Sequence, residues 1–265
     1  MSEHRARKRF GQHFLHDPAI IDRLVRSVAP RDGETLVEIG PGQGALTYPL
    51  LDEVRHLQVV ELDRDLIALL RERVAPERLT IHESDALRFN FAALAGDGPL
   101  RVVGNLPYNI STPLIFHLLD QADAVADMTF MLQKEVVERL TAAPGGKDYG
   151  RLSVMVQYHC QTDYLFFVPP GAFRPPPKVD SAVVRLTPYR TPPWPADDPD
   201  WLTRLVAQAF SQRRKAIRNS LKSLVDAEVF AATGIDAGLR PDHLTVADYV
   251  ALANASGAVH RHREQ

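Results

Sequence analysis

The sequence has little cysteine, no long apolar run and almost no net charge, and each shortage excludes a class of protein. Cys160 is the only cysteine among the 265 residues, so a scaffold held by internal disulfides is excluded and nothing favours secretion. The apolar runs have the length of strands and fall well short of the roughly 20 residues that cross a bilayer. Since no charged and then apolar leader opens the sequence either, we expect a cytoplasmic protein without a membrane span.

The small net charge removes the usual sign of a nucleic-acid partner. The formal charge is -2 and the isoelectric point is near 6.6, whereas a strongly basic domain is typical of nucleic-acid binding. Basic residues nevertheless gather at residues 5–9 and 212–222, so a nucleic acid would be contacted locally. These two stretches contain Arg5, Arg7, Lys8 and Arg9, and Arg213, Arg214, Lys215, Arg218 and Lys222.

Strand-like and helix-like segments alternate over most of the chain. Asp17 followed by Pro18 predicts the start of a helix, and apolar residues then recur at helical spacing until Pro30. Short apolar runs follow, separated by helix-like segments such as residues 63–74, which indicates a parallel sheet covered on both faces. The predicted fold class is therefore α/β, and such sheets bind ligands beyond the carboxyl ends of their strands. The expected strands are residues 35–39, 57–60, 79–81, 100–103, 128–132 and 179–186.

Proline residues indicate a domain boundary near residue 190. Pro188, Pro192, Pro193, Pro195 and Pro199 are typical of a linker, and the apolar residues beyond it fit helical spacing. We expect a Rossmann-like domain at residues 1–190, with a basic N-terminal arm, and a small all-helical domain at residues 191–265. Cys160 is expected in the core, and the cysteine and histidines show no spacing typical of a metal site, so no metal is expected.

A glycine-rich turn follows the first expected strand. Residues 38–45 read Glu-Ile-Gly-Pro-Gly-Gln-Gly-Ala, and Gly40 and Gly42 let the backbone approach a ligand before a helix begins. Glu61 follows the second strand, where it can accept hydrogen bonds from both hydroxyls of a ribose. NAD and S-adenosylmethionine share that ribose, so the turn predicts a nucleotide-type cofactor and leaves both open. Asp85, after the third strand, could accept the amino group of the cofactor's adenine, although an aspartate there is also typical of a turn.

The segment after the fourth strand indicates chemistry at an amino group. The lone pair of an adenine amino group is delocalised into the ring, so methyl transfer to it needs acceptors that hold the amino hydrogens and turn the lone pair outward. The Asn105 side chain is one such acceptor. Pro107 biases Leu106 toward an extended backbone, whose carbonyl is a second acceptor. Tyr108 offers a face on which a base can stack, a contact worth about 1 to 3 kcal/mol.

The second basic stretch predicts contact with phosphates. Arg214, Arg218 and Lys222 are spaced four apart, so on a helix they would share one face. Such a face is often only solvated, but residues 212–222 contain five basic residues and no acid, which favours a phosphate-binding stripe.

These motifs recur together in one family. The chain resembles the KsgA-type small-subunit ribosomal RNA adenine dimethyltransferases over nearly its whole length. The resemblance implies a class I methyltransferase sheet, S-adenosylmethionine as methyl donor, and dimethylation of two adjacent adenosines in the 3′-terminal hairpin loop of 16S rRNA. The substrate would be the small subunit or its precursor during assembly, and we expect a monomer. The matching residues are 9–15, 38–44, 105–111, 173–181, 210–215 and 242–244.

The resemblance also implies individual roles. His13 and Leu15 would contact the cofactor, together with the turn, the two acids and Asn105. His13 departs from the asparagine usual in the family, but a neutral imidazole can still donate one hydrogen bond and accept another. Phe173 would flank the target base opposite Tyr108. The alternative for Phe173 is a core residue beside a rigid run of prolines.

Two other functions stay open from the sequence. The related enzymes that methylate large-subunit RNA share the catalytic loops, although Gly11, Gln12 and residues 105–111 look more like the small-subunit enzymes. The glycine turn alone would also permit an NAD-dependent dehydrogenase. No evident hydride-transfer site with a paired acid and base supports that second alternative.

Overall fold

The computed structural model describes residues 13–96 and 98–263, with side chains up to Gly257. The basic residues 5–9 and the pair Gly11 and Gln12 lie outside the described residues, so what the sequence predicts for them stays a prediction. The chain divides into two compact units. The first contains the chain up to Val137 and Thr162–Pro188, and the second contains Glu138–Gln161 and the chain from Tyr189 on.

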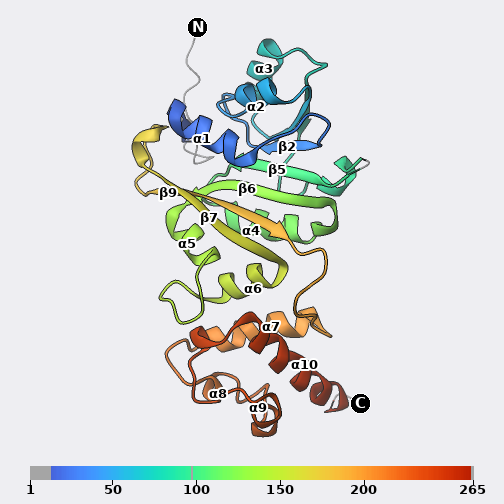
Figure 1. The fold of residues 1–265 in the computed structure, drawn as a ribbon, viewed down its shortest axis with the longest axis vertical. Coiled ribbons are helices and arrows are strands. Elements are labelled where there is room, and N and C mark those ends of the chain that lie inside the picture. Colours follow the sequence, from blue (N-terminus) through green and yellow to red (C-terminus); the bar gives the residue numbers. More distant parts are fainter. Residues whose placement is uncertain (1–12, 97, 264–265) are drawn as a thin grey trace. The chain divides into compact units, whose positions relative to one another are not determined.

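Seven strands form the main sheet, and the predicted α/β class is confirmed. Their order is β4-β3-β2-β5-β6-β9-β7. The pairs from β4 to β6 are parallel, whereas β9 runs antiparallel to β6; Figure 1 shows β6, β9 and β7 side by side. The strands are β2 (Leu36–Ile39), β3 (Leu57–Glu61), β4 (Leu79–Glu83), β5 (Leu100–Asn105), β6 (Val125–Gln133), β7 (Cys160–Val168) and β9 (Ser181–Pro188).

The edge strand β7 is the one strand of this sheet that the sequence pattern does not predict. Tyr164 and Phe167 are 39% and 44% exposed, whereas Phe166 between them is 4% exposed. Polar residues occupy positions 161–163 of the strand, and the apolar residues 164–168 follow one another without alternation. Its apolar pattern is therefore too irregular to stand out. Cys160, at its start, is fully buried as predicted.

Helices of the first unit precede or connect these strands, and the first of them is held at both ends. At its start the Asp17 carboxylate accepts two backbone N–H groups of the first turn, as the sequence predicts. At its end Arg101 donates to the Val28 carbonyl at 2.6 Å, and Arg101 also pairs with Glu34 at 3.0 Å and with Asp127 at 2.9 Å. The helices are α1 (Pro18–Val28), α2 (Thr47–Glu53), α3 (Arg64–Arg73) and α4 (Ser111–Leu119), and α5 (Lys134–Leu140) begins where this unit passes into the second.

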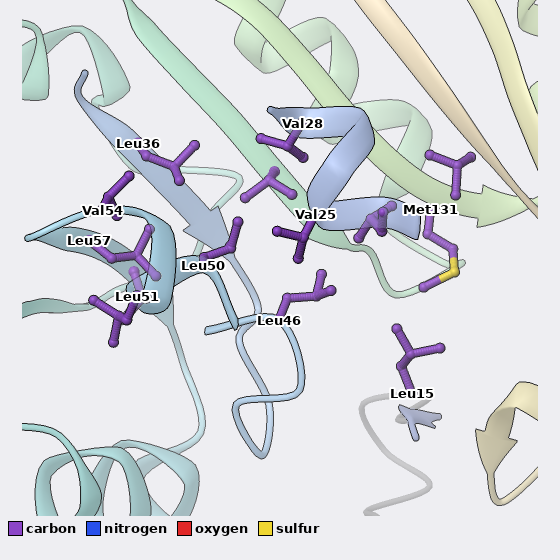
Figure 2. Packing of buried hydrophobic residues seen from close by; sticks show 14 of the residues in the cluster. Leu15, Val25, Val28, Leu36, Leu46, Leu50, Leu51, Val54, Leu57 and Met131 are labelled. Atoms are coloured by element: carbon purple, nitrogen blue, oxygen red, sulfur yellow. The ribbon is translucent and has the colours of Figure 1, made fainter. Parts of the chain in front are cut away.

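The core of the first unit lies between α1, α2 and the sheet. Val25, Val28 and Leu50 are 8%, 2% and 0% exposed, and Figure 2 shows them gathered in one cluster. Full burial of such a side chain contributes about 1.5 to 3 kcal/mol. Leu15 belongs to the same cluster and is 5% exposed. Its burial fixes the segment before α1, and this segment lines the site described below.

The second unit is helical in its described part after Pro188, as predicted. In it, the indole N–H of Trp201 donates to the Ser256 hydroxyl at 3.0 Å and ties α7 to α10. This unit also includes Glu138–Gln161, which precedes the boundary expected near residue 190. The prolines indicate a linker but give no sign that α6 packs against α7. The helices are α6 (Arg151–His159), α7 (Pro199–Phe210), α8 (Ile217–Ser220), α9 (Ala227–Thr233) and α10 (Val246–Arg263).

The expectation of one basic helical face at residues 212–222 is wrong. α7 ends at Phe210, the chain turns, and α8 covers only Ile217–Ser220. The backbone N–H of Ile217 donates to the Leu239 carbonyl at 2.7 Å, so it makes no helical bond to residue 213. The side chains of Arg214, Arg218 and Lys222 are exposed. They do not share the face of one helix.

Candidate cofactor and base-binding site

The predicted glycine turn joins β2 to α2. Gly40, Gly42 and Gly44 have φ angles of 65°, 58° and 90°, a region that strains other residues. At Gly44 a Cβ atom would also lie 2.5 Å from the ring of Tyr48. The turn therefore requires glycine, and it brings bare backbone to the wall of a cavity.

This cavity lies beyond the carboxyl ends of β2, β3, β4 and β5, where parallel strands bring their following loops together. Its volume is about 280 Å³, close to the lower end of the range for small-molecule sites, roughly 300 to 1,000 Å³. Of the predicted cofactor and catalytic residues, all but Phe173 line it. These are His13, Leu15, Gly40, Gly42, Glu61, Asp85, Asn105, Leu106 and Tyr108.

Glu61 is held in one orientation by backbone groups. Its Oε1 accepts the N–H groups of Leu62 at 2.8 Å and Asp63 at 2.9 Å, and its Oε2 lies 3.4 Å from the Gly42 nitrogen. Burial raises the pKa of the Glu61 carboxyl, and these hydrogen bonds oppose that rise. The fixed carboxylate keeps further acceptor capacity, since each of its two oxygens can accept more than one bond.

Glu38 is a buried acid of this site to which sequence reasoning assigned no role. It is 1% exposed, and its Oε2 accepts the Thr47 hydroxyl at 2.6 Å. Burial raises the pKa of Glu38 to about 8, against the opposing Thr47 bond and with a smaller contribution from the Glu61 charge. A charged residue inside the apolar run 36–39 is the sequence signal that could have singled it out.

Asp85 forms a turn and also lines the cavity. Its Oδ1 accepts the Leu87 N–H at 3.0 Å, and its backbone carbonyl accepts the Arg88 N–H at 3.0 Å. It is thus a turn-former, and it also lines the cavity. The turn fixes the carboxylate there.

The Asn105 amide is anchored by the N-terminal segment. Its Nδ2 donates to the His13 carbonyl at 3.2 Å, which leaves Oδ1 as an acceptor. Just before it, a Cβ on Gly104 would lie 2.7 Å from the Ile39 carbonyl oxygen, so β5 and β2 approach each other closely here. The backbone of the loop is thereby held against the glycine turn.

Tyr108 is held at its hydroxyl and beside one ring face. The hydroxyl lies 2.7 Å from the Ser181 hydroxyl, and burial raises the pKa of Tyr108. The His13 ring stacks on it with centroids 5.9 Å apart and planes at 28°. The His13 Nδ1 lies 2.8 Å from the Pro175 carbonyl oxygen. The histidine thus makes polar contacts through both its ring and its backbone.

Phe173 is a core residue in this structure, and its predicted contact with the target base stays a prediction. It is 2% exposed, belongs to the cluster around Leu15 and does not line the cavity. The strand β8 (Phe173–Arg174) pairs with β1 (Phe14–Leu15), which sets Phe173 opposite Leu15.

Among the five basic residues of the second stretch, Arg213 differs from the others. Its Nε lies 3.4 Å from Asp242 Oδ2, and its Nη2 donates to the Lys147 carbonyl at 2.5 Å. Arg214, Lys215, Arg218 and Lys222 are exposed. Arg213 therefore stabilises the second unit, and the exposed four stay the candidates for RNA contact.

Sequence comparisons identify the family of this chain. The family described as ribosomal RNA adenine dimethylase matches residues 3–256. The ribosomal RNA small subunit methyltransferase A of Alcanivorax borkumensis is 76% identical over 257 residues, 97% of this chain and 92% of that protein. The chain belongs to the ribosomal RNA adenine dimethylase family. The methyltransferase A of Pseudomonas aeruginosa is 60% identical over 254 residues, 95% of each chain.

Solved structures agree with this family. A dimethyladenosine transferase from Plasmodium falciparum has a TM-score of 0.77 at 27% identity, over 91% of this chain and 96% of that one. The 23S rRNA methyltransferase ErmE has a TM-score of 0.73 at 25% identity, over 92% and 99%. The sheet is thus of the class I methyltransferase type, as predicted.

Family membership excludes one of the alternative functions that the glycine turn left open. An rRNA adenine dimethylase transfers methyl groups to adenine and no hydride, so the NAD-dependent dehydrogenase is excluded. In the described part of the chain, no helix is long and apolar enough to span a membrane. Nor do the described histidines, cysteine and carboxylates include a group of three that could hold a metal ion.

Proposed function

We propose that this rRNA adenine dimethyltransferase uses S-adenosylmethionine to dimethylate two adjacent adenosines in the 3′-terminal hairpin loop of 16S rRNA during small-subunit assembly. One observation carries the proposal. The loop from Asn105 to Tyr108 and the glycine turn with Glu61 line the same cavity. The relatives named small subunit methyltransferase A support the choice of RNA.

The charges of the cavity favour this cofactor. Besides Glu38, whose raised pKa keeps it protonated near neutral pH, three acids line it, Glu61, Asp63 and Asp85, and its described lining includes neither lysine nor arginine. Such a wall suits a cation and repels the pyrophosphate of a dinucleotide. S-adenosylmethionine supplies a methyl group on a positively charged sulfur. Glu61 would accept the ribose hydroxyls, and Asp85 would accept the amino group of the cofactor's adenine.

The loop residues would hold the target amine. With Nδ2 bonded to the His13 carbonyl, Asn105 can turn only its Oδ1 toward an amino hydrogen. The Leu106 carbonyl would accept the second hydrogen, which directs the nitrogen lone pair out of the base plane. Tyr108 would stack on the base and help offset the few kcal/mol of unstacking. Rate enhancement would come mainly from alignment.

Methylation of isolated subunits tests the proposal. Enzyme and S-adenosylmethionine are incubated with small or large subunits, and the RNA is analysed by mass spectrometry and primer extension. We expect two adjacent dimethyladenosines in small-subunit RNA only. Asn105→Ala should lose most of this activity, whereas Asn90→Ala changes an exposed asparagine outside the cavity and should retain it. Product on the large subunit alone would overturn the proposed substrate and favour the activity of ErmE.

The exposed basic residues of the second unit would bind RNA phosphates. Each phosphate contact makes affinity fall with salt. The double variant Arg214→Glu with Arg218→Glu should weaken binding to 16S rRNA and leave affinity for S-adenosylhomocysteine unchanged. Equal RNA affinity of the double variant would contradict this role. We further propose a monomer that acts in the cytoplasm, which light scattering of the purified protein and fractionation of cells would test.

A further inference from the structure

An exposed aromatic ring and a lysine lie together outside the cofactor cavity. Phe167 of β7 is 44% exposed. The Lys134 Nζ, at the start of α5, lies 5.6 Å from the centroid of the Phe167 ring. Neither residue lines the cavity. Together they form a small surface, here called the Phe167–Lys134 surface.

Short contacts connect this surface to the target-base loop. The Tyr108 hydroxyl lies 2.7 Å from the Ser181 hydroxyl, at the start of β9. Ser181 lies opposite Gln133 in the register of β6 and β9, and the next residue, Lys134, donates its backbone N–H to the Asp180 carbonyl at 2.9 Å. Tyr108 and Lys134 are therefore connected through one pair of strand ends at the carboxyl edge of the sheet.

We propose that the Phe167–Lys134 surface binds the nucleotide that flanks the target adenosine, with its base on the Phe167 ring and its phosphate at the Lys134 ammonium. The inference rests on the proposed function, because it needs a target base at Tyr108. A base that leaves its stack exposes a face of its neighbour to water. An exposed aromatic ring replaces that lost stacking without regard to sequence.

Two further cations lie in the chain segment before β9. Lys178 and Arg174, in the segment that leads into β9, are both exposed. Lys178 lies close in the chain to Ser181, whose hydroxyl contacts Tyr108, and Lys134 follows the strand that pairs with Ser181. The Lys134 ammonium, which lies over the Phe167 ring, would swing aside to admit a base on that face and would then contact the phosphate of the stacked nucleotide. A purely apolar protein partner would not use these charges.

The test compares variants of Phe167 in the full-length enzyme with small-subunit RNA. Phe167→Ala should raise KM for the RNA about fivefold to tenfold, the lower part of the range for one base on one ring, with kcat and affinity for S-adenosylhomocysteine unchanged. Phe167→Leu keeps apolar volume but removes the ring and should behave like Phe167→Ala, whereas Phe167→Trp should restore KM. Tyr164→Ala removes an aromatic residue of similar exposure earlier on β7 and should leave KM unchanged.

A spectroscopic probe separates stacking from a structural effect. RNA with 2-aminopurine beside the target adenosine should lose fluorescence on binding the wild-type enzyme, and Phe167→Leu should abolish that loss. Lys134→Gln should lower the salt dependence of RNA binding by about one phosphate contact. Unchanged KM and unchanged fluorescence in Phe167→Leu, with an active wild-type enzyme, would overturn the inference. A wild-type enzyme that does not methylate small-subunit RNA would instead overturn the proposed function.

Discussion

Replacing Glu38 by glutamine should flatten the pH dependence of stability between about pH 5.5 and pH 7.5. Burial raises the pKa of Glu38 from its ordinary value of 4.5 to about 8. Between these values the native protein holds a proton that the unfolded chain has lost. The contribution of Glu38 to stability is therefore complete below pH 4.5 and falls as the pH rises through about 8. Glutamine keeps the shape and the acceptor for Thr47 but does not titrate.

The magnitude follows from the linkage of protons to folding. A group protonated in the native state and ionised in the unfolded state changes the free energy of unfolding by about 1.4 kcal/mol per pH unit. Over the two units considered, with incomplete ionisation at each end, Glu38 should remove about 2 kcal/mol of stability. That is a large part of the 5 to 15 kcal/mol, roughly, of an ordinary domain.

Urea unfolding of both proteins at three pH values in this window measures the effect. Other titrating groups act equally in both proteins, so the difference between wild type and Glu38→Gln isolates Glu38. The Thr47 hydroxyl lowers the pKa of Glu38, so Thr47→Val should extend the wild-type decline to higher pH. Parallel curves for wild type and Glu38→Gln would refute the reasoning, because Glu38 would then be ionised in the native protein.

Other sites allow shorter tests. Gly104→Ala sets a Cβ 2.7 Å from the Ile39 carbonyl oxygen and should cost about 1 to 3 kcal/mol, with slower methylation; an unchanged melting temperature would contradict the close approach. Arg213→Met should lower the melting temperature, whereas Arg214→Met should weaken RNA binding only, and the reverse pattern would exchange their roles. Burial raises the pKa of the Cys160 thiol to about 12, so iodoacetamide should label it only after unfolding; rapid labelling of the native protein would contradict that burial.

Short-range signals were sufficient for the parts of the site that follow strands. The turn at Gly40 and Gly42, the acids Glu61 and Asp85, and the loop at Asn105 each come directly after an apolar run. In a parallel sheet those positions meet at one edge. Periodicity and turn chemistry therefore predicted the α/β class and these cavity-lining residues, whereas His13 and Leu15 were expected in the site only from the family resemblance.

Long-range contacts account for what the sequence did not predict. Phe173 is buried because β8 pairs with Leu15 of β1, a contact between residues far apart in the chain. The helical spacing at residues 212–222 was overridden by the Ile217 backbone bond to Leu239. The proton on Glu38 depends on burial, which no neighbour in the sequence reports.

The position of β9 in the sheet has a consequence for synthesis. β9 lies between β6 and β7, although it is the last of the three to leave the ribosome. Until Ser181–Pro188 emerges, β6 has one open edge and β7 has no neighbour in the sheet. The Tyr108 hydroxyl likewise has no hydrogen bond to Ser181 until that residue emerges, 73 residues later in the chain. A nascent chain that already contains every residue of the cofactor cavity should therefore still lack the Ser181 contact that holds Tyr108, the residue proposed to bind the target base.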